Sequence, residues 1–176
     1  MYEMVNSASD FNENSLEKTK KVNICKLTVI NSNIYINLMV KIYSISTIRK
    51  KVREYGKKIN APSHILTVRT TSNGFGTPHI EINEKGYNYV ICERGREHER
   101  RQTKDINKLL YWIIDSIVFI MASEYELKNR KNNEDFRRQL FTKEIELMEQ
   151  LDSKFAQWKK EELDKTLEES PYEDSL

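Results

Sequence analysis

Hydrophobic residues recur every three or four positions near residue 50, the spacing of a helix that buries one face. Ile48, Val52, Tyr55 and Ile59 form this stripe, and Ser46 precedes it as a candidate N-cap. Lysines and arginines occupy the positions between them. The pattern predicts an amphipathic helix with a basic solvent face that ends before the proline at position 62.

Between residues 64 and 103 the pattern changes to short runs in which apolar and polar residues alternate, as they do in strands. Gly, Asn and Pro separate these runs and favour turns. The pattern predicts an antiparallel meander whose last, very polar strand suits a sheet edge. The predicted strands cover residues 64–69, 79–83, 87–92 and 96–103, separated by a loop at 71–78 and turns at 83–86 and 93–95.

The last third of the chain predicts three helices. The first runs from a cap at Thr103 or Asp105 to about residue 128, and residues 109–121 are apolar nearly all round, which predicts a central helix with Trp112 buried. The second covers residues 132–151, and Asp152 caps the third; the acidic end, residues 169–176, is predicted to fray. The predicted buried stripes are Phe136, Leu140, Phe141, Leu147 and Met148 on the second helix, and Phe155, Trp158, Leu163 and Leu167 on the third.

Strands grouped before helices indicate the α+β class. We predict an N-terminal helix, an antiparallel meander of three or four strands, and then three C-terminal helices packed against the sheet. A length of 176 residues suits one domain with a sizeable core. We expect this domain to cover residues 44–176.

Residues 1–43 form an atypical N-terminal extension, since they contain seven Asn but no Gly, Pro or Arg. We expect residues 1–20 to be disordered because they are polar, whereas residues 22–43 are β-prone enough for one or two strands. The alternative is that the extension is not native and that Met39 is the true start. In that case residues 1–38 are dispensable for folding.

Cysteine usage and charge narrow the class of protein. Cys25 and Cys92 lack the spacing of a disulfide framework or a zinc motif, which favours a reducing, cytoplasmic setting. The longest apolar stretch, residues 109–122, is short for a bilayer and is interrupted by Asp115, so no membrane partner is expected. Residues 44–104 carry 13 Lys and Arg against 6 Asp and Glu, whereas residues 105–176 carry 11 against 17. Such a bipolar chain can attract a charged partner by either end.

Catalytic signatures are absent from the sequence, which contains no P-loop, GxGxxG, GxSxG or HExxH motif. The Gly-Phe-Gly of residues 74–76 is interpreted as an ordinary loop. His79, Glu81, Cys92 and Glu93 offer zinc-type ligands, but their spacing matches no ligand pattern, so they are interpreted as polar residues on a sheet surface. We predict a protein without enzymatic activity, cofactor or metal.

The densest polar cluster is residues 93–101, which places four arginines and three glutamates around one histidine. Arginines bind carboxylates or phosphates through paired hydrogen bonds. The interleaved glutamates favour a protein interface over nucleic acid, and a solvated edge strand is the remaining alternative. The candidate partner-binding residues are Glu93, Arg94, Arg96, Glu97, His98, Glu99, Arg100 and Arg101, and the alternative acidic surface consists of Glu161, Glu162 and Asp164.

The run PHIEINEKGYNYVICERGREHERRQTKDINKLLYWI, residues 78–113, resembles the immunity protein 63 family of bacterial polymorphic toxin systems. The blocks at 122–130, 135–141 and 146–148 are similar to the same family, and the resemblance extends over about residues 46–170. It implies a protein that binds and neutralises a cognate toxin domain in the cytoplasm. The family offers no catalytic residues to carry over. A nucleic-acid-binding or metal-dependent protein that uses the polar sheet region 79–101 is the alternative, and the oligomeric state stays open.

Overall fold

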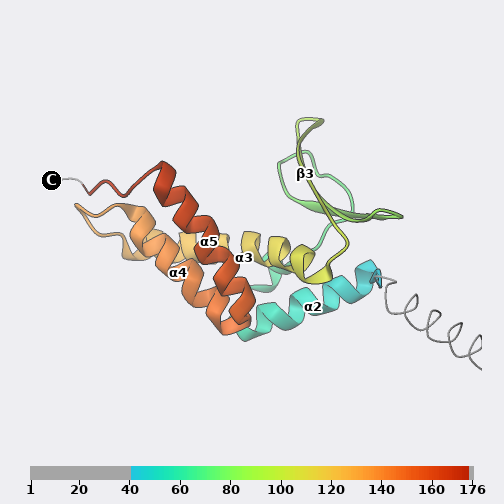
Figure 1. Ribbon diagram of the computed structural model, residues 1–176, viewed down its shortest axis with the longest axis horizontal. Helices are drawn as coiled ribbons and strands as arrows, with labels where there is room; N and C mark the ends of the chain where they lie inside the picture. Colours follow the sequence, from blue (N-terminus) through green and yellow to red (C-terminus); the bar gives the residue numbers. More distant parts are fainter. Residues whose placement is uncertain (1–40, 175–176) are drawn as a thin grey trace, which may run out of the picture. The chain divides into compact units, whose positions relative to one another are not determined.

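The computed structural model describes residues 41–174 (Figure 1). Within them lie helix α2, a three-stranded antiparallel sheet and then helices α3, α4 and α5, which confirms the predicted α+β class. The strands predicted within 22–43 lie almost wholly outside the described residues, and residues 41–43 are not in a strand. The proposed extension and the start at Met39 therefore stay predictions.

Helix α2 spans Ile45–Lys58 and buries the predicted stripe. Ile48 and Val52 are fully buried against the core, and Ile59 follows at the C-cap. The predicted cap was wrong by two residues, because Ser44, not Ser46, accepts a hydrogen bond from the backbone N–H of Thr47. Both serines lie near the helix start, and only Ser44 has the extended backbone that capping requires.

Residues 64–69 were predicted to be a strand, and this was wrong. The structure has a 3₁₀ helix over Ser63–Leu66, and only Arg69 forms an isolated bridge to the sheet. Pro62 begins this turn with its carbonyl accepting from the N–H of Ile65. The adjacent Ile65 and Leu66 both pack against the core, which a strand with alternating faces does not allow.

The sheet consists of β1 (His79–Asn83), β2 (Gly86–Glu93) and β3 (Arg96–Thr103), in that order. β1 and β3 have the predicted bounds, and both turns lie where the sequence placed them. Tyr89 in β2 pairs with Arg101, and this face of the sheet packs on α3. In Figure 1 the hairpin labelled β3 extends away from the helices.

Gly86 holds the β1–β2 turn in a conformation that a side chain cannot share. Its φ is +118°, and a Cβ atom there would lie 2.5 Å from the carbonyl oxygen of Thr103. We expect Gly86→Ala to lower the free energy of unfolding by about 2–3 kcal/mol through backbone strain and steric overlap. Gly95→Ala is the matched control, because Gly95 has a φ of +77° with no atom near its Cβ position. Equal losses in urea unfolding of the two variants would contradict the packing argument.

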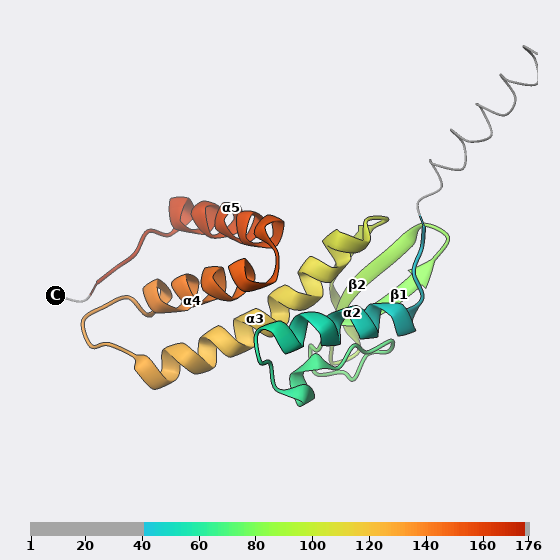
Figure 2. The ribbon, with the colours of Figure 1, turned by 90° about the horizontal axis from the view of Figure 1, so that it is seen from below.

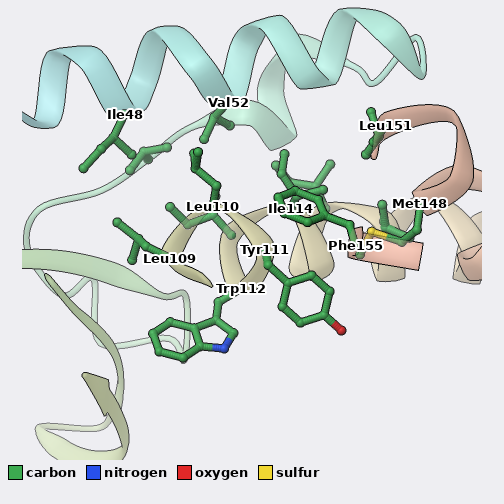
Figure 3. Close-up of a cluster of buried hydrophobic side chains, with 14 of the residues drawn as sticks. Ile48, Val52, Leu109, Leu110, Tyr111, Trp112, Ile114, Met148, Leu151 and Phe155 are labelled. Atoms are coloured by element: carbon green, nitrogen blue, oxygen red, sulfur yellow. The ribbon is translucent and has the colours of Figure 1, made fainter. Parts of the chain in front are cut away.

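Helix α3 (Ile106–Asn129) begins at Asp105, which accepts from the N–H of Asn107, and forms the centre of the core. Its residues 109–114 are all buried, between α2 and α4 on two sides and the sheet on a third. Figure 3 shows Ile48 and Val52 pointing from α2 toward this helix. By length and composition α3 could cross a membrane, a property that it shares with the core helices of water-soluble proteins.

Helices α4 (Phe136–Leu151) and α5 (Ser153–Glu169) complete the described fold. Figure 2 shows α4 beside α3 and α5 beside α4. Of these three helices, α3 is the one that packs on strands β2 and β3. Asp152 caps α5 as predicted, with its carboxylate accepting from the N–H of Lys154 at 2.8 Å. Phe136 was wrongly predicted to be buried: it is 49% exposed in the first turn of α4, where the Arg130 guanidinium covers its ring.

The acidic tail does not fray over residues 170–174. Arg137 donates to the carbonyl of Ser170 at 2.8 Å, and Arg138 pairs with Asp174 at 2.9 Å. Asp135, the N-cap of α4, accepts from Arg137 and from the N–H of Glu173, and these bonds hold its pKa well below the usual range. The prediction failed because the arginines that bind the tail lie more than thirty residues upstream.

Candidate protein-interaction site

The candidate residues 93–101 occupy the β2–β3 hairpin. Its two-residue turn is Arg94-Gly95, and both residues have positive φ, 48° and 77°. That geometry defines the turn type whose twist matches paired strands, and it favours Gly or Asn over other residues. Arg94 is therefore an unusual occupant, placed at the most projecting point of the hairpin.

Arg100 is fully engaged within the sheet. Its guanidinium donates two hydrogen bonds to Glu97, at 2.8 and 2.7 Å, and a third to Glu81 of β1 at 2.6 Å. These bonds hold the pKa of both carboxylates below their usual values. These three residues form an ion-pair cluster on the outer face of the sheet. All three guanidinium nitrogens of Arg100 donate within this cluster, so the side chain is not available to a partner.

Arg101 also serves the fold. It forms an ion pair with Glu99, and its guanidinium lies 5.8 Å from the ring centre of Tyr89 and 5.9 Å from that of Trp112. A planar cation over aromatic rings is a stabilising arrangement. The Arg101 side chain therefore packs where β3 meets α3. Because its charge and its guanidinium plane are used within the fold, it is a poor candidate for the predicted binding role.

The unengaged groups of the segment gather near the hairpin tip. The side chain of Arg94 is 90% exposed, and its ion pair with Glu93 is long at 3.7 Å. Arg96 and His98 have no side-chain partner among residues 41–174. His98 lies at a β-bulge, since Ile91 pairs with Glu99 and Cys92 with Glu97. Within the predicted cluster, Arg100 and Arg101 therefore stabilise the fold, whereas the side chains near the hairpin tip remain available to a partner.

The alternative acidic surface divides in the same way. Glu162 accepts a hydrogen bond from the Tyr111 hydroxyl at 2.7 Å, and burial together with this carboxylate raises the pKa of Tyr111. Glu161 accepts a hydrogen bond from Gln157 of its own helix, at 3.0 Å, and Asp164 is exposed. Glu161 and Asp164 thus remain available on α5, whereas Glu162 joins α5 to α3.

The zinc-type ligands do not converge. His79 is buried and lies 3.5 Å from Glu81, whose other oxygen is bound by Arg100. Within the part of the chain that the structure describes, no three His, Cys, Asp or Glu residues are placed to hold a metal ion. The geometry therefore offers nothing that favours the metal-dependent alternative.

Sequence reasoning missed a buried charged cluster between the three C-terminal helices. Lys159 of α5 forms ion pairs with Asp115 of α3 and, at 3.4 Å, with Glu144 of α4. Burial raises the pKa of Glu144, and this effect exceeds the lowering by the positive charge of Lys159. Burial lowers the pKa of Lys159, but the attraction of the two carboxylates is larger, so the pKa of Lys159 is raised. The only sequence signal was Asp115 within an apolar helix.

Two exposed apolar features were also missed. Phe75, in the loop before β1, is 85% exposed. On α3, Ile120 and Leu127 lie seven residues apart on one helix face and are 40% and 66% exposed. Ile120 also borders a cleft of about 100 Å³. Large exposed apolar side chains next to polar groups are typical of contact surfaces, so both features are candidates.

The described fold is that of a small α+β protein with exposed polar side chains on the β2–β3 hairpin and exposed apolar side chains on α3 and the loop before β1. Residues 83–165 match the model of a family described as immunity protein 63, so the chain resembles that family from the β1–β2 turn into α5. The match confirms the predicted resemblance over a shorter range than residues 46–170. Immunity proteins of toxin systems generally have a toxin as partner and are generally not enzymes. No curated protein and no solved structure matches the chain.

Proposed function

We propose that this protein is an immunity protein that binds a cognate bacterial toxin domain in the cytoplasm and neutralises it by contact, without catalysis. The observation that carries the proposal is the immunity protein 63 match over residues 83–165. That segment contains the whole β2–β3 hairpin, where Arg94 and Arg96 extend toward solvent. Exposed charge of this kind speeds the encounter with a complementary partner.

Protection by binding and protection by catalysis differ in stoichiometry. When the purified protein is titrated into the toxin domain encoded by the adjacent gene, we expect toxin activity to fall linearly and to vanish at an equimolar ratio. We expect a Kd of about 10 nM or below, since an inhibitor must hold its toxin at cellular concentrations. Calorimetry and a toxin activity assay give the two measurements.

Growth of bacteria that express the toxin domain provides the matching test in cells. Co-expression of this protein should restore growth, and a toxin domain from an unrelated system serves as the specificity control. Loss of toxin activity at a small fraction of equimolar protein would point to catalysis instead. If the protein neither binds its neighbour nor protects cells, the immunity proposal fails.

A further inference from the structure

Phe75 is held outward by a loop that leaves its ring no role in folding. Phe75 is 85% exposed, and its ring pairs with no aromatic or cationic side chain among residues 41–174. Exposing such a ring to water is unfavourable, because a large apolar side chain gains roughly 2 kcal/mol from burial. A single exposed aromatic residue on a flexible loop would need no explanation, but this loop is well ordered by its hydrogen bonds.

The loop is preorganised on both sides of the ring. Gly74 and Gly76 have φ values of +77° and +75°, which side chains rarely adopt. The carboxamide of Asn73 accepts from the N–H of Phe75 at 3.0 Å and donates to Thr77 at 2.9 Å. Ordering an exposed ring before binding reduces the entropy lost when a partner covers it.

Backbone hydrogen bonds join this loop to the hairpin tip. The N–H of Gly76 donates to the carbonyl of Cys92, and the N–H of Arg94 donates to the carbonyl of Gly74, both at 3.0 Å. Phe75 is thereby paired antiparallel with Glu93. These contacts hold the loop against the tip of the β2–β3 hairpin.

The pairing places three side chains in a row on one face of the sheet. Phe75 is opposite Glu93, and Glu93 is opposite Arg96. Directly opposed residues of antiparallel strands point to the same face, with Cβ atoms about 5 Å apart. Arg94 stands at the turn beside this row and is 90% exposed. The result is an aromatic anchor next to two available guanidinium groups and one carboxylate.

We infer that the row Phe75, Glu93 and Arg96, together with Arg94, is the surface that docks the toxin domain, on a partner surface with an apolar pocket bordered by carboxylates. The inference rests on the proposed function and names the contact that it requires. Aromatic and Arg residues are the side chains most often found at binding hot spots. Two guanidinium groups against one carboxylate leave a cationic excess, which fits an acidic rim.

Kinetic measurement separates the two parts of this surface. With the toxin domain encoded by the adjacent gene immobilised, we expect Phe75→Ala to weaken binding by about tenfold or more, chiefly through faster dissociation, because an anchor is lost. We expect Arg96→Glu to slow association instead, and the deficit to shrink as salt is raised. Both variants should keep the thermal midpoint of the unmodified protein, because neither side chain contributes to the core.

Two controls match these changes in chemistry and exposure. Leu127→Ala removes an apolar side chain that is 66% exposed on α3, and Arg53→Glu reverses an exposed charge on α2. We expect each to bind within about twofold of the unmodified protein, as contacts outside a hot spot do. The Leu127 control also tests the exposed apolar face of α3 as a rival surface.

The outcomes distinguish the docking surface from the proposed function. If the unmodified protein binds and both Phe75→Ala and Arg96→Glu bind equally well, the surface is assigned wrongly although the immunity function stands. Loss of binding in Leu127→Ala alone would place the contact on α3 and overturn the inference as well. Absence of binding by the unmodified protein would overturn both proposals together.

Discussion

Replacing Lys159 with Met is expected to lower the free energy of unfolding by about 3–5 kcal/mol, because it leaves buried carboxylates without their counter-charge. The side chains of Lys159 and Glu144 are 7% and 3% exposed, and Asp115 completes the cluster. One residue comes from each of α3, α4 and α5, so the loss should affect the packing of all three helices. Urea unfolding followed by circular dichroism measures it.

The pH dependence of this variant follows from the raised pKa of Glu144. A carboxyl group with a raised pKa stabilises the fold fully below its unfolded-state pKa, and this contribution is lost as pH rises through the folded-state value. Removal of Lys159 raises the folded-state pKa further, because the positive charge no longer lowers it. We therefore expect the deficit relative to the unmodified protein to be smaller near about pH 5 than near about pH 8.

A charge-neutral triple variant is the control for this prediction. Asp115→Leu, Glu144→Met and Lys159→Met together replace the ions by apolar side chains of similar volume. We expect this variant to regain much of the lost stability, because replacing a whole buried ion cluster is often nearly neutral. Stability of Lys159→Met close to that of the unmodified protein would show that the cluster is reached by water and is not a buried ion network.

The second large effect is expected for Trp112→Ala, which should cost about 3–5 kcal/mol by leaving a cavity. Trp112 is 8% exposed, and its ring centre lies 6.2 Å from that of Tyr89, so it fills the space between α3 and the sheet. The loss would also remove the ring beneath the Arg101 guanidinium. We therefore expect the β2–β3 hairpin to lose hydrogen-exchange protection along with global stability.

Trp112→Phe keeps most of the aromatic volume and serves as the control. It should cost markedly less than Trp112→Ala, because the cavity that remains is smaller. The midpoint and slope of denaturant unfolding distinguish a loss of stability from a change in the exposed surface. A cost below about 1 kcal/mol for Trp112→Ala would mean that the site collapses around the missing ring and does not depend on it.

The sequence pattern correctly predicted the elements whose bounds are set by interactions between residues close together in the chain. The bounds of β1 and β3 and the caps at Asp105 and Asp152 follow from alternation, turn residues and capping chemistry within a few neighbouring positions. The predicted strand at 64–69 was wrong because the adjacent residues Ile65 and Leu66 both pack against the core, whereas neighbouring residues of a strand point to opposite faces. The prediction that Phe136 is buried was wrong because its spacing places it on the apolar stripe of the helix, but the core does not extend as far as this first turn.

The candidate site shows the same division. The nine-residue cluster at 93–101 was correctly placed on a hairpin at the sheet edge, but its four arginines looked equivalent in the sequence. Arg100 is occupied by Glu81, nineteen residues away on a strand that is not its neighbour, and Arg101 by the rings of Tyr89 and Trp112. Contacts of this kind depend on strand register and helix packing, which no short window of sequence contains.

By itself the sequence determined the order of helices α2 to α5 and of strands β1 to β3, the apolar central helix, the polar hairpin and the resemblance to the immunity protein 63 family. These properties follow from the spacing of residue types along the chain, and backbone geometry translates that spacing directly into faces and turns. Only the tertiary structure decided which arginines are free, that Lys159 meets two carboxylates, and that Phe75 pairs with Glu93 of the hairpin. Each of these depends on distances between segments remote in sequence, which are set when the whole core packs.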